Sequence, residues 1–391
     1  MAAIEFADVK PKDIDLTGIP TGWNILSEAE HSLAWDFLSG RNTETLRSII
    51  TMEGRNTFIL RPGSPDPIYT HIQLSGGFYK ELEISRNGMA ISKNTVHLLS
   101  ADNFVLGREP MFRTNAITED GQITTTQPDY VPTGAYTQMQ AIKKAIDTLS
   151  ITASLEKLKA LDFPDKKMFM VPRIVGVYQF PEVTDPTGEP VYGIAMLTSS
   201  PENRLSQRIN SFFNRYGKHY EASINRRIQR NFGYQTVALG AAIRTLHDSF
   251  DLYHRQITSG NCEIVTLPDN QFTPFFHDWS TTMRLPKNLR PNRMARAIDL
   301  IIPWASVSIL MDHMRETGAT NNDVAQFMTT SFLANLTAGY VHLLPRRSNE
   351  FEKELFSQFT LAETDSSTVE RLANFITSFD ATIGVETEEE I

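Results

Sequence analysis

The spacing of apolar residues changes near residue 200, and this change limits the folds that the chain can adopt. Before Thr198 the apolar residues come mainly in short runs separated by Gly, Asn and Pro, a pattern typical of β-strands and turns. After Pro201 they recur mainly at three- and four-residue spacing, which indicates helices. A chain of 391 residues is long enough to bury two cores. We therefore expect an α+β protein with two segregated lobes, one rich in strands and one helical.

Three segments follow from this division. Residues 1–50 are expected to form an N-terminal helical extension, in which Ser27 caps a helix and Glu30 completes a capping box. Residues 51–197 are expected to form the β-rich lobe with one major helix, and residues 198–391 the helical lobe.

Each lobe has predictable elements. Strands of the first lobe are predicted at Thr57–Leu60, Tyr69–Leu74, Leu82–Ile84, Val96–Leu99 and Phe104–Leu106. The same lobe is predicted to hold a helix and then a long hairpin, at Thr137–Leu161 and at Met168–Phe180 with Val191–Leu197. Helices of the second lobe are predicted at Leu205–Tyr216, Val237–Leu246, Arg293–Met314, Val324–Tyr340 and Val369–Phe379.

Charge limits the class of partner. The net charge of −9 argues against a general nucleic-acid-binding protein, because such a protein needs clustered cations. The nearest basic group is Arg226 and Arg227 with Arg230, which we expect to be a solvated helix face. No nucleic-acid partner is therefore expected.

Composition also indicates a compartment. The single cysteine, Cys262, excludes an intramolecular disulfide, and on a predicted strand it is expected to fill the core rather than act as a nucleophile. The most apolar stretch, Ile298–Met311, is short and contains Pro303, so we expect no membrane span. The acidic N-terminal residues do not resemble a signal peptide. A cytoplasmic location is expected.

Two polar runs in the second lobe carry the candidate chemistry. The first begins at His254, ends at Asn261 and reads HRQITSGN. The second reads HDWS and contains Asp278. A hairpin is predicted between them at 263–276, and a helix that ends in Leu246-His247 precedes the first run.

This order resembles the catalytic centre of the protein-kinase-like fold, in which a loop H-R-D-L-x-x-x-N precedes a D-F-G segment. The resemblance implies that Asn261 and Asp278 coordinate Mg²⁺ that bridges the phosphates of ATP. It also implies that His254 ties the loop to the metal-binding segment and that Arg255 supports the loop. Gln256 stands where the family has its catalytic Asp. A carboxamide can hold a hydroxyl by hydrogen bonds, but it cannot accept the proton near neutral pH.

The same residues also have a purely structural interpretation. Asp278 could cap a turn, and the side chain of Asn261 could satisfy backbone groups of the loop. Similarly, His247, His254 and His277 match no metalloprotease spacing and are expected to be structural rather than metal ligands.

The resemblance extends to the first lobe with fewer matching residues. The helix at Thr137–Leu161 and the hairpin after it resemble helix C and strands 4 and 5, which would make Thr198–Glu202 the hinge that holds the adenine. The pair Gly76 and Gly77 is the candidate turn over the phosphates, and Lys80 is the candidate cation for the α- and β-phosphates. Other candidates for these two roles are Ser85–Gly88, Lys93 and Arg108. No V-A-I-K motif is present, and no A-P-E follows within the short segment before the next predicted helix.

Three functions remain open. The first is a pseudokinase that binds Mg²⁺ and ATP and acts as a scaffold or regulator. The second is a transferase that moves AMP or phosphate from ATP. The selenoprotein-O-like branch of the fold also lacks the loop Asp and transfers AMP, and in that case Asp248 or Asp251 would be a substitute base. The third is an interaction protein on a relic kinase fold that binds no nucleotide. The expected partners are a nucleotide and a protein substrate or partner.

Overall fold

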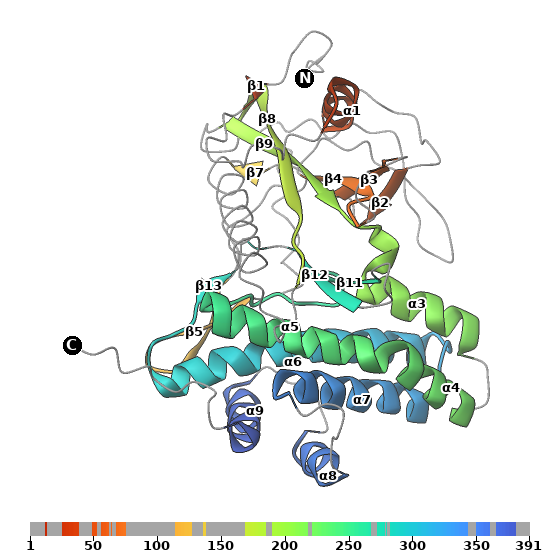
Figure 1. Ribbon diagram of the computed structural model, residues 1–391, viewed down its shortest axis with the longest axis vertical. Helices are drawn as coiled ribbons and strands as arrows, with labels where there is room; N and C mark the ends of the chain where they lie inside the picture. The colour runs from red at the N-terminus through yellow and green to blue at the C-terminus, as the bar shows by residue number, and fades with distance from the viewer. Residues whose placement is uncertain are drawn as a thin grey trace. The chain divides into compact units, whose positions relative to one another are not determined.

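The computed structural model describes most of the second half of the chain and parts of the first (Figure 1). The described residues are 12–13, 26–38, 49–52, 56–61, 64, 68–75, 114–126, 136–137, 169–184, 190–217, 221–266, 272–277, 279, 282–342, 349–359 and 365–380. The chain forms two compact units. The first comprises residues 1–112, 127–156 and 171–201, and the second comprises residues 113–126, 157–170 and 202–391.

The first unit contains an antiparallel sheet. Its strands are β1 (Lys12–Asp13), β2 (Ile49–Met52), β3 (Asn56–Leu60), β4 (His71–Ser75), β7 (Tyr136–Thr137), β8 (Arg173–Thr184) and β9 (Pro190–Thr198). Their order is β1-β8-β9-β4-β3-β2, and β7 also pairs with β9. Strands β8 and β9 form the predicted long hairpin, although β8 continues to Thr184, four residues into the segment predicted as a turn.

The N-terminal helix of the first unit begins as its sequence predicts. Helix α1 (Glu28–Leu38) follows Ser27, whose backbone N–H donates to Glu30 Oε2 at 2.8 Å, while the N–H of Glu30 donates to Ser27 Oγ at 3.3 Å. These reciprocal bonds confirm the capping box. The helix packs on the sheet, since Trp35 contacts the ring of Tyr178 in β8 at a centroid distance of 6.2 Å.

Several predicted elements of the first half lie outside the described residues. They are the strands at 82–84, 96–99 and 104–106 and the helix from residue 138 onward. Thr137, the predicted first residue of that helix, lies in β7 instead and pairs with Val191 of β9. Pairing along a strand fixes this residue in extended backbone, so the helix cannot begin there.

The second unit is mainly helical. Its helices are α3 (Leu205–Tyr216), α4 (Glu221–Ile228), the π-helical turn η2 (Gln229–Gly233), α5 (Tyr234–Phe250), α6 (Leu289–Glu316), α7 (Asn322–Tyr340), α8 (Asn349–Gln358) and α9 (Ser366–Phe379). Its strands form the pairs β5 (Thr114–Ile117) with β6 (Ile123–Thr126), β10 (Leu252–Tyr253) with β13 (Met283–Arg284), and β11 (Cys262–Thr266) with β12 (Phe272–Phe276). A short 3₁₀ turn, Pro201–Asn203, precedes α3 and lies at the boundary between the units.

Two glycines allow the main helices of this unit to approach closely. Helix α5 packs along α7, and α6 packs on α7 and α9 (Figure 1). A Cβ at Gly240 would lie 2.0 Å from the carbonyl oxygen of Leu336, and one at Gly339 would lie 2.1 Å from that of Val237. The backbones of α5 and α7 therefore meet where neither helix carries a side chain.

Helix α6 is the one element, among the described residues, that is long and apolar enough to cross a membrane. However, 67% of its most apolar window is buried within the protein. Its buried residues include Ile298, Leu300, Ile301 and Trp304, so the apolar composition serves the core of the second unit.

Candidate functional site

The candidate site is the loop from His254 to Asn261, and the end of α5 fixes where this loop starts. The helix stops at Asp251, which adopts left-handed backbone (φ 54°) and donates its N–H to the carbonyl of His247 at 3.2 Å. Two residues of strand β10 follow, in which Tyr253 is fully buried. The chain then enters the loop with its direction set by the helix cap and by the pairing of β10 with β13.

The carboxylate of Asp299 in α6 holds the first two residues of the loop. Its Oδ2 accepts from the backbone N–H of His254 at 2.6 Å, and its Oδ1 accepts from that of Arg255 at 2.7 Å. Asp299 is fully buried. Arg255 has φ of 72°, a conformation that disfavours a residue with a side chain. The two charge-assisted bonds from Asp299 stabilise this unusual backbone.

The second half of the loop is held two helical turns farther along α6. The backbone N–H of Ser259 donates to Ser306 Oγ at 2.9 Å, and the two hydroxyl oxygens lie 2.7 Å apart. From the other side, Arg204 Nη1 donates to the carbonyl of Gly260 at 2.7 Å. Residues seven apart lie on one face of a helix, so Asp299 and Ser306 together present one edge of α6 to the whole loop.

The hairpin after the loop sets the position of Asn261 relative to the second polar run. Cys262 pairs with Phe276 in the ladder of β11 and β12, as the predicted hairpin requires. One residue beyond, the N–H of His277 donates to the carbonyl of Asn261 at 2.9 Å. Asp278 itself lies outside the described residues. The register nevertheless puts Asn261 opposite the residue that precedes Asp278.

The ring of His254 contacts the segment that contains Asp278. It is fully buried and lies edge-on to the ring of Trp279 at a centroid distance of 4.8 Å, and to that of Phe276 at 6.0 Å. The loop and the HDWS run are thus joined by side-chain packing as well as by the ladder. The role that the sequence resemblance implies for His254 stays a prediction.

A buried polar pair, Glu263 in β11 and His277 just after β12, lies on the hairpin that follows Asn261, and sequence reasoning does not find it. Glu263 is fully buried, and its Oε1 accepts from His277 Nε2 at 2.8 Å. Arg204 Nε lies 3.8 Å from the same oxygen. Among the described residues, His277 Nδ1 has no hydrogen-bond partner. The only sequence signal is a charged residue within an otherwise apolar strand, CEIVT.

Gln256 occupies the middle of the loop and is half-buried. Its backbone N–H donates to His254 Nδ1 at 3.3 Å, and its carbonyl accepts from the N–H of Thr258 at 2.7 Å. These bonds fold the loop back on itself around Gln256. Arg255 beside it is buried, and this burial lowers the pKa of its guanidinium below the ordinary range.

Asp248, the candidate substitute base, is held by two arginines. Arg244 donates to its Oδ2, and Arg296 Nη1 donates to its Oδ1 at 2.7 Å. Burial alone would raise the pKa of Asp248, but these two guanidinium groups outweigh it and lower the pKa. A carboxylate stabilised in this way is a weak proton acceptor, so we do not retain Asp248 as a base.

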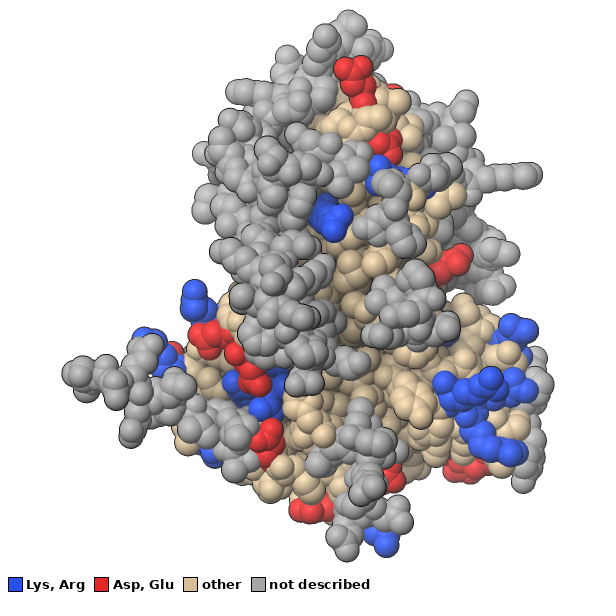
Figure 2. Space-filling view, viewed as in Figure 1, with Lys and Arg blue, Asp and Glu red and all other residues tan. Residues whose placement is uncertain are grey.

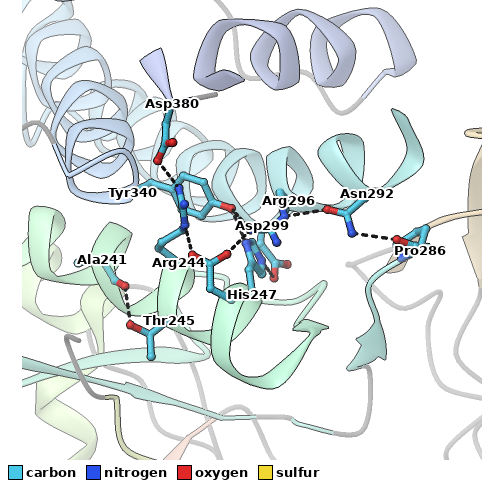
Figure 3. Close-up of polar contacts among 11 residues, drawn as sticks. Ala241, Arg244, Thr245, His247, Pro286, Asn292, Arg296, Asp299, Tyr340 and Asp380 are labelled. Atoms are coloured by element: carbon cyan, nitrogen blue, oxygen red, sulfur yellow. Dashed lines mark hydrogen bonds and ion pairs between the residues drawn. The ribbon is translucent and has the colours of Figure 1, made fainter. Parts of the chain in front are cut away.

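His247 connects this network of polar side chains to Asp299, the residue that holds the loop (Figure 3). Its Nε2 lies 3.1 Å from Asp299 Oδ2, and its Nδ1 lies 2.7 Å from the hydroxyl of Tyr340. Because the carboxylate can only accept, Nε2 carries the proton and Nδ1 accepts from Tyr340. Burial raises the pKa of Tyr340 to about 12, which keeps its hydroxyl protonated as a donor.

The described residues contain neither a cluster of metal ligands nor an exposed cysteine thiol. Among the described residues, no group of three or more His, Cys, Asp or Glu side chains could hold a metal ion. Cys262 is fully buried, and burial raises the pKa of its thiol, in keeping with a core residue. The remaining predicted site residues of the first half lie outside the described residues, namely Gly76, Gly77, Lys80, Ser85–Gly88, Lys93 and Arg108.

Comparisons with known proteins add little to this geometry. No protein-family profile matches the sequence, and no curated protein matches it. Among solved structures, the kinase domain of maize sucrose-induced receptor kinase 1 bound to AMP-PNP is similar over 85% of this chain and 92% of that chain, with 10% sequence identity and a TM-score of 0.30. At that TM-score the likeness carries no argument about fold, and a kinase-like fold for this chain is a proposal that rests on the loop itself.

Proposed function

We propose that the protein has a kinase-like fold and binds Mg²⁺ and ATP as a pseudokinase that acts through a protein partner. One observation carries the proposal: the loop from His254 to Asn261 is fixed by Asp299, and its last residue lies in register with His277, next to Asp278. A kinase catalytic centre needs a rigid loop that ends in Asn beside a segment that carries Asp.

The residue types at positions 261 and 278 suit a magnesium ion. Asn261 is half-buried at the end of the loop, and its backbone is held by Thr258 and His277. A carboxamide oxygen from Asn261 and carboxylate oxygens from Asp278 would be its ligands, and Mg²⁺ prefers such oxygen ligands. When bound, the ion would neutralise charge on the phosphates.

Gln256 favours binding without ordinary phosphate transfer. It stands at the position of the base, and its amide cannot take a proton from an acceptor hydroxyl. Asp248 does not replace it, because Arg244 and Arg296 already bind its carboxylate. Positioning and metal alone can still accelerate a transfer, so the second candidate is slow transfer of AMP or phosphate.

The first test is thermal unfolding with and without millimolar ATP, each with and without Mg²⁺. A ligand at one hundred times its Kd adds about 2.7 kcal/mol, which raises Tm by several degrees. We expect this increase in the wild type, and its loss in Asp278→Ala and Asn261→Ala. Asp312→Ala, an exposed aspartate at the far end of α6, should keep the increase. An equal increase in Tm in the wild type and in all three variants would contradict the assignment of Asn261 and Asp278 as metal ligands.

Transfer of label then separates the two candidates. ATP labelled on the α-phosphate would mark an acceptor if AMP is transferred, and ATP labelled on the γ-phosphate would mark it if phosphate is transferred. We expect a Mg²⁺-dependent Tm increase and transfer of neither label. Transfer of the α-label would replace the pseudokinase by an AMP-transferase, and transfer of the γ-label would replace it by an active kinase.

A further inference from the structure

Four arginines gather on the surface of the second unit, away from the loop. Arg215 ends α3, Arg226 and Arg227 lie in the last turn of α4, and Arg230 lies in η2. All four are exposed. Figure 2 shows basic side chains grouped over the part of this unit that carries α4. We call these four residues the arginine cluster.

Tyr216 brings two members of the cluster together. The guanidinium of Arg227 lies 4.5 Å from the centroid of its ring, and that of Arg215 lies 5.2 Å from it. A cation within about 6 Å of an aromatic face is attracted by the ring. The two guanidinium groups come from different helices, and the shared ring holds them as neighbours.

The other two members add charge to the same surface. Arg226 and Arg230 are four residues apart, and Arg227 and Arg230 are three apart, so their side chains are neighbours on one helical surface. Like charges at this spacing destabilise a helix slightly. These like charges are grouped here although the chain as a whole is acidic, with a net charge of −9.

Carboxylates of the described residues do not neutralise the cluster. Elsewhere in the unit exposed arginines are paired, as Arg290 is with Glu370 and Arg315 with Asp312. Within the described part of the chain, no ion pair involves a member of the cluster, although Glu221 lies in the same helix. Among the described residues the cluster is therefore a concentrated positive surface without a paired carboxylate.

An exposed aromatic residue flanks this positive surface. Tyr234 follows η2, four residues after Arg230, and 74% of it is accessible to solvent. A π-helical turn such as η2 widens the helix locally, and such turns are frequent at functional sites. The cluster thus combines cations with an apolar side chain, a composition that suits a protein partner.

We propose that Arg215, Arg226, Arg227, Arg230 and Tyr234 form a docking surface for an acidic peptide segment of a partner protein. Guanidinium groups bind carboxylates by paired, charge-assisted hydrogen bonds. Four cations match a short run of carboxylates, whereas the net charge of −9 repels a long polyanion such as a nucleic acid. Tyr234 contacts an apolar residue of the segment.

The test is binding of a fluorescein-labelled peptide that has a run of glutamates and a terminal leucine, followed by fluorescence anisotropy on the full chain. A matched peptide has glutamines in place of the glutamates. The wild type binds the glutamate peptide more tightly, and added salt weakens that binding. The double variant Arg226→Glu/Arg227→Glu lowers the affinity at least about tenfold, a change of about 1.4 kcal/mol. Tyr234→Ser lowers it about threefold without changing the salt dependence.

The control is the double variant Arg284→Glu/Arg315→Glu, which changes the net charge equally at two exposed arginines outside the cluster. It should bind the peptide as the wild type does. Equal losses in both double variants would overturn the proposal, because net charge alone would then explain the binding. Tighter binding of oligouridylate than of the glutamate peptide, lost in the same cluster variant, would also overturn it. Arg226→Gln/Arg227→Gln gives an intermediate loss and avoids charge reversal on the helix.

Discussion

Asp299 Oδ2 accepts a hydrogen bond from the backbone N–H of His254 at 2.6 Å, across a separation of 45 residues. The same carboxylate binds the next amide of the loop and the ring of His247. One buried side chain of α6 therefore connects the end of α5 with the candidate catalytic loop. The geometry of this loop depends on the core of the helical unit as well as on its own sequence.

Replacing Asp299 by Asn should destabilise the protein strongly. The amide keeps one acceptor oxygen and replaces the other by an NH2 group, which can only donate, at a site where two backbone N–H groups and an imidazole N–H all need an acceptor. Breaking a buried charged network of this kind costs about 3–5 kcal/mol in the free energy of unfolding. Urea unfolding measures the loss. Asp312→Asn, on the exposed end of α6, should change the value by less than about 0.5 kcal/mol. Equal effects of the two substitutions on the free energy of unfolding would contradict the role of Asp299 in holding the loop.

Lowering the pH should weaken the protein through His247. Burial lowers the pKa of this imidazole below its ordinary value, against the opposing effect of Asp299. The unfolded chain takes up the proton near pH 6.5 and the folded chain only at lower pH, so the contribution to stability is complete above pH 6.5 and is lost as the pH falls. The limiting slope is about 1.4 kcal/mol per pH unit.

His247→Gln should make the free energy of unfolding depend less steeply on pH between pH 7 and pH 5. Urea unfolding at each pH measures this. Some slope should remain, because the pKa of His342 is also lowered by burial. His313→Gln, in the exposed last turn of α6, should keep the wild-type slope. If His247→Gln also kept it, His247 would not be the titrating group.

The pair Arg296 and Asp248 should show a measurable coupling energy. A double-mutant cycle with Arg296→Met and Asp248→Asn is expected to give between about 0.5 and 3 kcal/mol, because the arginine is buried and both groups belong to one network. The exposed pair Arg290 and Glu370 is a matched comparison at 2.9 Å, where a smaller coupling energy is expected because solvent screens the two charges. A coupling energy no larger than that of the exposed pair would show that Asp248 acts independently of Arg296.

Gly240→Ala should disrupt the contact between α5 and α7. The added methyl group would overlap the carbonyl oxygen of Leu336, and backbone atoms of two packed helices must move apart. We expect a loss of about 3 kcal/mol or more in the free energy of unfolding. Gly233→Ala is the matched control on the same continuous helical stretch, because its Cβ would lie 3.2 Å from the end of the Gln229 side chain. A smaller loss is expected there, and a similar loss would argue against the close backbone approach.

Gln256→Asp should introduce the missing base. If ATP binds as proposed, transfer of the γ-phosphate label should rise above that of the wild type, because a positioned general base contributes about hundredfold or more. Gln256→Asn, which stays neutral, should show no increase. An increase that persists in Gln256→Asp/Asp278→Ala would mean that transfer does not use the proposed metal site.

Local sequence predicted those elements whose signals lie within a few residues. Helix α3 has the bounds that its apolar spacing predicts, and the capping box of Ser27 and Glu30 forms as expected. The hairpin of β11 and β12 lies where strand and turn residues place it. The arginines of α4 lie on an exposed helical face, as their spacing suggests. In each case the decisive interactions are between near neighbours in the chain.

Other elements gave weak local signals. Helix α8 and the pair β5 and β6 are not predicted as such, and residues 113–126 belong to the helical unit although they lie in the strand-rich half of the sequence. The hydroxyl of Tyr253 accepts from the N–H of Ile117 at 3.2 Å, and Asn288 donates to the carbonyl of Glu119 at 2.9 Å. These contacts join segments more than one hundred residues apart, so no local pattern contains them.

The sequence by itself determined the order of the polar runs, the types of their residues and the neutral residue Gln256 within the first run. Tertiary structure decided how those residues are held. Asp299 is a single charged residue in the apolar run around Ile298 and Leu300, and only the packing of α6 under the loop supplies its partners. Asp248 is a candidate base in the sequence, but in the structure Arg244 and Arg296 bind its carboxylate. A carboxylate acts according to the groups that surround it, and those groups come from distant parts of the chain.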